Sequence, residues 1–211
     1  MQKKPKVDRW SFEALTYIVA TRLEFKALQR EMPHARIVEA GIALSKVAGE
    51  LGDIVVSCGI AGGLRDDLPT GTLLIPKEIR RPNGSTLRCD DELVEAFADS
   101  ARRLGFVPVF DGLLTSERIV NGAERGLWAA KGFAGVDMES GLLRATRVAA
   151  VRVVLDTPGR EISADWASPL TAMLKPWNWA QALWLAREAP RAAALAARVV
   201  AGRRASQIGC V

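Results

Sequence analysis

The chain has 211 residues, of which 49% are hydrophobic, enough for one domain with a substantial core. Lysine and arginine outnumber aspartate and glutamate by 29 to 24. These basic residues are dispersed and accompany no nucleic-acid-binding motif, so we expect no nucleic-acid partner. Three cysteines and one histidine, without metal-ligand spacing, argue against a disulfide framework or a metal site.

Neither a signal peptide nor a membrane span is evident in the sequence. Residues 1–14 begin with a polar, charged segment that lacks the apolar region of a secretory signal. The alanine-rich run at 192–197 is bounded by Arg191 and Arg198, and is far shorter than the roughly 20 apolar residues that span a bilayer. We therefore expect a cytoplasmic protein, with residues 1–14 as an N-terminal extension and residues 15–211 as one domain.

Short apolar runs alternate with helical patterns over the first three quarters of the chain, as is typical of an α/β fold. Asp90 is a plausible N-cap and Gly105 a plausible stop for the best-bounded helix. The predicted strands are residues 15–20, 36–39, 53–58, 72–75, 107–114, 132–137 and 150–155. The predicted helices are residues 23–31, 45–51, 90–104, 123–131 and 139–148.

The pattern changes after residue 156. Residues 160–211 read as an alanine-rich helical tail, broken by Pro176 and Pro190. Trp177, Trp179 and Trp184 of this tail, with its arginines, could form a surface for peripheral membrane contact. Tryptophans at helical spacing more often pack in the core or against another subunit, and the alternatives stay open.

Two carboxylates follow predicted strands late in the domain. Glu139 comes just after the strand at 132–137, and Asp156 closes the strand at 150–155. If a helix connects the two strands, the right-handed crossover places both carboxylates at the carboxyl edge of one sheet, where open α/β folds bind ligands. A glycine-rich segment at 58–64 follows the strand at 53–58, and is either a ligand-binding loop or a tight turn that only packs.

Five segments together carry a more specific signal. They are Gly-Ile-Ala-Gly-Gly-Leu at 59–64, Leu-Pro-Thr-Gly-Thr-Leu-Leu-Ile at 68–75, Gly-Leu-Leu-Thr-Ser at 112–116, Val-Asp-Met-Glu-Ser at 136–140 and Arg-Val-Val-Leu-Asp at 152–156. In order and spacing they resemble the superfamily of purine nucleoside phosphorylases and methylthioadenosine/adenosylhomocysteine nucleosidases, over roughly residues 17–156. The resemblance implies a single α/β domain with a mixed central sheet flanked by helices, a helical C-terminal tail, a nucleoside substrate, no cofactor and a homo-oligomer.

Within that superfamily the chain is most similar to the hopanoid-associated phosphorylases, which act on adenosylhopane. It shares their short N-terminal part, which leads from the first helix to Ile-Val-Glu-Ala-Gly at 37–41, and their version of the glycine segment. This resemblance implies release of adenine from adenosylhopane in hopanoid side-chain biosynthesis. A hydrolytic nucleosidase acting on methylthioadenosine-type nucleosides and a non-catalytic nucleoside-binding module are the alternatives.

The resemblance also implies roles for individual residues. Asp156 would be the acid near purine N7, which requires a raised pKa that a dry apolar setting could provide. Glu139 would accept hydrogen bonds from the ribose hydroxyls, with Met138 against the ribose face. Glu24 would order the attacking water, or else be an ordinary exposed helical glutamate.

The remaining substrate-binding residues implied by the resemblance are Gly59, Ile60, Ile119 and Val120. One departure concerns the nucleophile. Ser57 and Ile60 stand where hexameric phosphorylases bind phosphate with arginine and serine. Phosphate as co-substrate and water as nucleophile are both open, and the resemblance to the hopanoid-associated phosphorylases favours phosphate.

Overall fold

The computed structural model describes residues 15–47, 49–163, 166 and 175–202. In these residues the centre of the molecule is a mixed sheet of nine strands, in which β3 pairs with β1, β8 and β9. The main path through the sheet runs β2-β1-β3-β8-β7-β5-β6, and β9 pairs with β3 and β4. The strands are β1 (Leu15–Val19), β2 (Arg36–Glu39), β3 (Ile54–Gly63), β4 (Leu73–Leu74), β5 (Glu78–Arg80), β6 (Thr86–Arg88), β7 (Gly112–Thr115), β8 (Phe133–Asp137) and β9 (Arg147–Val154).

Strand β3 changes partner along its length. Its apolar first part, from Ile54 to Ala61, pairs with β9 in parallel, whereas Gly62 and Gly63 pair with β8 in antiparallel orientation. The glycine motif is therefore the end of a strand and not the loop or turn expected from the sequence. Because β1 is also parallel to β3, the carboxyl ends of β1, β3 and β9 open on the same side, where β8 also ends.

The predicted βαβ unit around Glu139 is absent from the structure. In place of a helix at 139–148 there is a 3₁₀ turn, η3 (Ser140–Leu142), and β9 begins at Arg147. The side chain of Asp137 accepts the backbone N–H of Ser140 at 3.2 Å, and Thr115 Oγ1 accepts that of Gly141 at 2.7 Å. These side-chain bonds fix a turn where a helix would otherwise begin. Glu139 and Asp156 thus reach the same cavity through β8 and β9, which run in opposite directions along β3.

Other expectations fail for local reasons. No helix forms in the described residues of 45–51, where a 3₁₀ turn, η2 (Ile42–Leu44), precedes an irregular segment, and Gly49 and Gly52 both have φ of +94°. The strand expected at 107–114 shrinks to β7, because Val107 is exposed and only an isolated bridge forms before Gly112. The short strands β5 and β6 were not expected.

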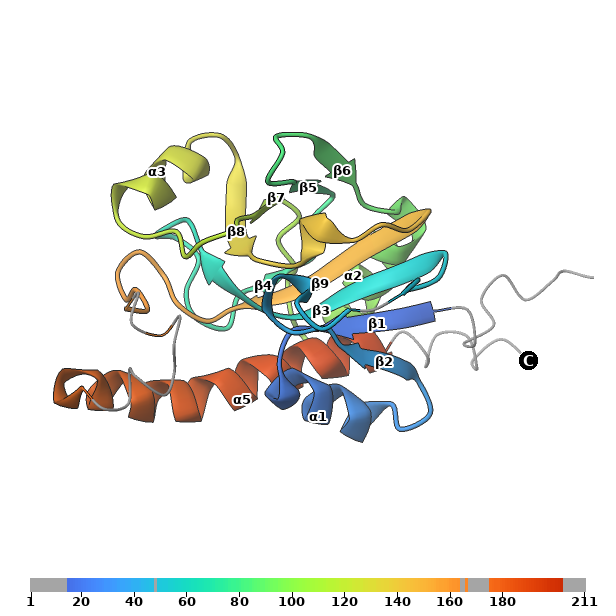
Figure 1. Ribbon diagram of the computed structural model, residues 1–211, viewed down its shortest axis with the longest axis horizontal. Helices are drawn as coiled ribbons and strands as arrows, with labels where there is room; N and C mark the ends of the chain where they lie inside the picture. Colours follow the sequence, from blue (N-terminus) through green and yellow to red (C-terminus); the bar gives the residue numbers. More distant parts are fainter. Residues whose placement is uncertain (1–14, 48, 164–165, 167–174, 203–211) are drawn as a thin grey trace, which may run out of the picture.

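Among the described residues, four α-helices surround the sheet: α1 (Arg22–Glu31), α2 (Asp91–Arg103), α3 (Ala123–Ala129) and α5 (Trp179–Gly202), with a 3₁₀ turn, η5 (Pro176–Asn178), before the last. Asp90 caps α2 by accepting from Leu93 N at 3.0 Å, and Gly105, with φ of +82°, follows the C-cap, both as expected. In Figure 1, α5 runs the length of the molecule beside α1.

The C-terminal helix differs from expectation in its continuity. Pro190 lies inside α5 and does not end it. The helix continues because its following turns bury a face of small residues in the main core cluster, against β3 and β9. That face comprises Ala192, Ala193, Leu195, Ala196, Ala197, Val199 and Val200. No helix in the described part of the chain has the length and apolarity required to cross a bilayer.

Candidate active site

A cavity of about 380 Å³ opens where β1, β3, β8 and β9 end. Its volume lies toward the lower end of the range of roughly 300–1,000 Å³ typical of small-molecule sites. Most of the lining is aliphatic, and the charged groups are few. The lining residues are Ala20, Thr21, Leu23, Glu24, Ile42, Ile60, Ala61, Gly62, Arg118, Ile119, Val120, Arg125, Val136, Asp137, Met138, Glu139, Leu155, Asp156, Ile162 and Ala189.

The cavity gathers all but one of the residues proposed from the sequence as site residues. Glu24, Met138, Glu139 and Asp156 line it together, as do Ile60, Ile119 and Val120. Gly59 lies behind the lining. Its lack of a side chain leaves room for two charged groups. A Cβ there would stand 2.2 Å from Glu24 Oε1 and 2.7 Å from Arg152 Nη1, so only glycine lets both groups approach β3 this closely.

Glu24 is fixed by its place in the first turn of α1. Its Oε2 accepts the backbone N–H of Thr21 at 2.8 Å and that of Ala20 at 3.1 Å, and so completes a capping box. Its Oε1 accepts the N–H of Ile60, from β3, at 2.9 Å. The carboxylate is buried and lines the cavity, which excludes the alternative of an ordinary exposed glutamate.

Glu139 lies at the same end of the cavity, just beyond β8. Its carboxylate accepts long hydrogen bonds from the N–H groups of Ala43 and Met138, both at 3.3 Å, and stands 3.6 Å from Arg152 Nη2. Burial raises the pKa of Glu139 to about 7; Arg152 opposes this rise, whereas the carboxylates of Asp137 and Glu24 add to it. The group is therefore poised to gain or lose a proton near neutral pH.

Arg152 lies behind these carboxylates, in the middle of β9. Its Nη2 contacts Asp137 Oδ2 at 2.8 Å, Ser57 Oγ at 2.6 Å and Ser140 Oγ at 3.0 Å. Burial opposes its charge, but Asp137, Glu139 and Glu24 raise its pKa above the ordinary value. Its Nε and Nη1 are buried and have no hydrogen-bond partner among the described residues. We call Glu24, Asp137, Glu139 and Arg152 the Arg152 cluster.

The opposite end of the cavity holds an ion pair that we call the Arg125 pair. Asp156 Oδ2 contacts Arg125 Nη2 and accepts the N–H of Ile162 at 3.3 Å. The two side chains are 6% and 2% exposed. The sequence led us to expect a dry apolar setting that would keep Asp156 protonated. The setting is dry, but it is not purely apolar, because the guanidinium of Arg125 lies beside the carboxyl group.

Arg125 and Arg152 are the functional candidates that the sequence reasoning missed. The sequence contains a signal for Arg152, which lies within the apolar run at 151–155. A charged residue in such a run is buried if the run forms a central strand, and a buried charge is almost always paired. It contains no such signal for Arg125, since an arginine in a short surface helix is ordinary. Among the described residues, no group of three or more His, Cys, Asp or Glu side chains is arranged to hold a metal ion.

Comparison with known proteins places the chain in a family. Residues 37–201 match the phosphorylase superfamily, and the chain belongs to that superfamily. No curated protein matches the sequence significantly. Solved structures, in contrast, match nearly the whole chain.

The similar structures share the fold at low sequence identity. A methylthioadenosine/adenosylhomocysteine nucleosidase from Neisseria meningitidis, in complex with methylthio-immucillin-A, matches with a TM-score of 0.68 and 19% identity, over 92% of this chain and 99% of the other. A mutant nucleosidase from Helicobacter pylori with 5′-methylthioadenosine in its active site matches with a TM-score of 0.69 and 12% identity, over the same shares. The native futalosine hydrolase of Helicobacter pylori has a TM-score of 0.66 and 12% identity, over 91% and 97%.

Proposed function

We propose that the protein cleaves the N-glycosidic bond of an adenine nucleoside and releases adenine. The observation that carries this proposal is the convergence of Glu24, Glu139 and Asp156 on one small, mostly aliphatic cavity. Glu139, when ionised, can accept hydrogen bonds from two sugar hydroxyls while positive charge develops on the sugar ring. Asp156, at the other end, would activate the departing base. Membership of the phosphorylase superfamily and the nucleosidase-like fold support this assignment.

Water is the nucleophile that the charges favour. The Arg152 cluster holds three carboxylates against a single guanidinium, and such an excess of negative charge disfavours a phosphate dianion. The N–H of Ile60, at a position matched to a phosphate-binding residue of hexameric phosphorylases, already donates to Glu24. A neutral water between Glu24 and the unpartnered nitrogens of Arg152 costs no such repulsion. We therefore favour hydrolysis over the phosphorolysis that the sub-family resemblance suggested.

The rest of the cavity indicates a substrate with an apolar 5′ group. Leu23 and Ile42 line the cavity and are 38% and 50% exposed, so they form an apolar rim. Helix α5 contributes Ala189, whereas none of the described tail tryptophans belongs to the lining. The cavity accommodates a nucleoside, and a large apolar group would leave it over this rim. Adenosylhopane fits this description, as does a smaller 5′-alkylthio nucleoside.

A direct assay tests this proposal. Adenine release is measured with adenosine, methylthioadenosine and adenosylhopane as substrates. We expect turnover of at least one 5′-apolar nucleoside, at a higher kcat/KM than that of adenosine, because an apolar substituent gains about 25 cal/mol for each Å² that it buries on the rim. The substitution Leu23→Ser should lower the ratio of kcat/KM for the 5′-apolar nucleoside to kcat/KM for adenosine. Faster turnover of adenosine than of either analogue would exclude the apolar-substrate assignment, and absence of adenine release from all three would exclude the activity.

Exposed apolar side chains before and at the start of α5 suggest two kinds of contact, with a membrane surface or with a second copy of the chain. Trp177 of η5 is 72% exposed, and Trp179 and Leu183 at the start of α5 are 60% and 75% exposed. Trp184, in contrast, lies under the guanidinium of Arg160. Exposed indoles beside cationic residues suit an interface with lipid headgroups, and they would equally suit a second copy of the chain. Co-sedimentation of wild type and Trp177→Ser/Trp179→Ser with anionic vesicles separates the two: loss of binding supports lipid contact, whereas a change of mass in light scattering supports oligomerisation.

A further inference from the structure

A second cavity, of about 260 Å³, lies outside the candidate active site and has a different balance of charge. It forms at the carboxyl ends of β5 and β7, which are parallel neighbours, and open α/β sheets bind ligands at such ends. In Figure 1 the hairpin of β5 and β6 and helix α3 lie at the top of the view, opposite α1 and α5. The charged lining residues are Arg80, Arg81, Arg118, Glu117 and Glu124. We call this cavity the Arg80 pocket.

Two arginines of the Arg80 pocket lack a counter-ion. Arg80 and Arg81 are half-buried, and neither forms an ion pair with any residue that the structure describes. Arg80 Nη2 lies over the hairpin turn, 3.5 Å from where a Gly84 Cβ would stand. Arg81 Nη2 donates to the carbonyl of Leu143 at 3.3 Å. A guanidinium that loses part of its hydration without gaining an anion is unfavourable, so both groups favour the entry of a negatively charged ligand.

The hairpin that carries these two arginines is well defined. Its strands β5 and β6 pair in antiparallel orientation, with Arg80 opposite Thr86. In the turn the N–H of Arg81 donates to the carbonyl of Ser85 at 2.9 Å, and the N–H of Gly84 donates to that of Arg81 at 3.0 Å. Gly84 has a φ of +82°, which glycine adopts without strain. The two cations are therefore held side by side before any ligand arrives.

The carboxylates of the Arg80 pocket do not cancel its positive charge. Glu124 Oε2 lies 2.8 Å from Arg118 Nη2, so these two charges compensate each other. Glu117 is exposed, and solvent and salt screen its charge. A further cation lies nearby, because Lys131 Nζ stands 4.4 Å from the ring centre of Trp128, which belongs to the lining. The Arg80 pocket thus has an excess of positive charge, whereas carboxylates outnumber the guanidinium in the Arg152 cluster.

We propose that the Arg80 pocket binds the phosphate group of a small ligand, either inorganic phosphate or a phosphate monoester. A guanidinium can donate two parallel N–H groups to phosphate oxygens, and two adjacent guanidinia offer two such forks. The indole of Trp128 packs edge-on against Phe133 at 5.6 Å and forms an apolar wall for an organic substituent. The site goes beyond the proposed glycosidic cleavage, and its test requires no nucleoside.

Isothermal titration calorimetry tests the proposal with inorganic phosphate and phenyl phosphate, at an ionic strength kept constant with potassium chloride. We expect wild type to bind with a Kd of about 1 mM or lower, and Arg80→Gln to raise that Kd by about 10- to 100-fold. Arg36→Gln is the matched control and should bind as wild type does. It removes an exposed arginine of β2 that donates to the carbonyl of Glu50 at 3.4 Å, outside both cavities.

The two ligands distinguish the sources of the phosphate group. Tighter binding of phenyl phosphate, with the difference lost in Trp128→Leu, would assign the pocket to a phosphate monoester, and equal affinities would assign it to free phosphate. Absence of binding below about 10 mM would overturn the proposal. So would wild-type affinity in Arg80→Gln, since the anion would then bind elsewhere. Circular dichroism checks the fold of this variant; if it is lost, Arg81→Gln takes its place, with the same expected and contrary results.

Discussion

In the Arg152 cluster, three carboxylates surround one guanidinium, whereas the guanidinium of Arg125 has two carboxylate neighbours, the buried Asp156 and the partly exposed Glu161 at 3.3 Å. Both ends of the cavity are buried, so the difference lies in the balance of charge. At the crowded end the pKa of Glu139 rises to about 7, and one group becomes proton-sensitive near neutrality. At the other end the buried carboxyl group of Asp156 is paired with Arg125. One cavity thus offers acidic groups in two electrostatic settings, which suits a reaction with separate sugar and base ends.

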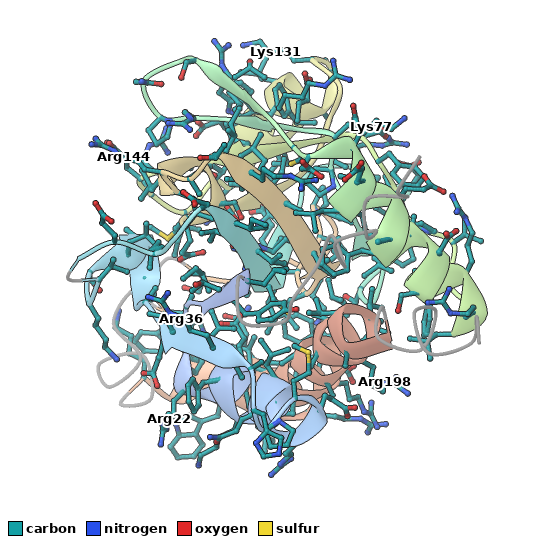
Figure 2. All side chains as sticks on the ribbon, turned by 90° about the vertical axis from the view of Figure 1, so that its right-hand side faces the viewer. Arg22, Arg36, Lys77, Lys131, Arg144 and Arg198 are labelled. Atoms are coloured by element: carbon teal, nitrogen blue, oxygen red, sulfur yellow. The ribbon has the colours of Figure 1, made fainter. Side chains whose placement is uncertain are left out.

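The basic side chains on the outside of the molecule contrast with these two buried arginines. Arg22, Arg36, Lys77, Lys131, Arg144 and Arg198 lie around the periphery in Figure 2. Arg22, for example, pairs with Glu39 at 3.3 Å, and its side chain is 66% exposed. Such pairs contribute little to stability, whereas removal of a buried partner leaves an uncompensated charge. The largest effects of substitution are therefore expected inside the cavity.

The largest expected effect is on turnover at the Arg125 pair. Asp156→Asn removes the transferable proton, and kcat should fall by about 10²- to 10⁴-fold while the fold is retained. Adenine release and circular dichroism measure the two quantities. Asp67→Asn, which alters an exposed carboxylate paired with Arg65, is the control and should leave turnover unchanged. Near-normal adenine release by Asp156→Asn would show that this residue is not the acid.

The next effect is on stability at the Arg152 cluster. Arg152→Met leaves the buried carboxylates without a cation, and the free energy of unfolding should fall by about 3–5 kcal/mol. The loss should be larger at pH 8 than at pH 5, because protonation of Glu139 relieves part of the repulsion. Urea unfolding at both pH values measures it. Arg147→Met, at a partly exposed ion pair, should cost about 1 kcal/mol or less. Equal losses for the two variants would contradict the contrast drawn between buried and exposed pairs.

Glu139→Gln should separate function from stability. Loss of a charged acceptor for the sugar hydroxyls should weaken kcat/KM by about 10- to 100-fold. The pKa of Glu139 in the folded state, about 7, lies above its ordinary value of 4.5, so the folded protein holds this proton more tightly than the unfolded chain. The contribution of Glu139 to the free energy of unfolding is therefore fully present below about pH 4.5 and is lost as the pH rises through 7.

The glutamine of Glu139→Gln does not titrate, so this variant does not lose stability at position 139 as the pH rises. Relative to wild type, Glu139→Gln should gain stability between pH 4 and pH 8, on the order of 3 kcal/mol. Unfolding curves at several pH values follow the difference between the two proteins, which cancels the titration of all other groups. A difference that does not change with pH would mean that Glu139 titrates normally.

The smallest expected effect is steric. Gly59→Ala places a Cβ 2.2 Å from Glu24 Oε1, so the carboxylate or the strand must shift, at a cost of about 1–3 kcal/mol in stability together with a loss of turnover. Gly126→Ala is the matched control, because a Cβ in this helical position meets no atom within 4 Å. It should instead stabilise the protein by about 0.5–1 kcal/mol. Wild-type turnover in Gly59→Ala would show that the close approach of Glu24 to β3 has no role.

The sequence predicted the class of fold and named many of the residues that line the cavity, but not how they come together. Glu139 and Asp156 were expected to share one sheet edge through a right-handed βαβ crossover, whereas they line one cavity because β3 changes partner at Gly62. Strand pairing of that kind depends on contacts between residues far apart in sequence, which periodicity does not report. For the same reason the ion pair of Asp156 with Arg125, 31 residues away, could not be anticipated. Local signals performed better: the cap at Asp90 is present as predicted.

The most direct test of the account concerns the nucleophile at the Arg152 cluster. A nucleoside substrate is incubated with enzyme in heavy-oxygen water, with and without phosphate, and the sugar product is analysed by mass spectrometry. Excess negative charge around Arg152 predicts adenine release that does not depend on phosphate, with one heavy oxygen at the anomeric carbon of the free sugar. A reaction that requires phosphate and yields the sugar 1-phosphate would contradict the account and would mean that the cluster binds an anion after all.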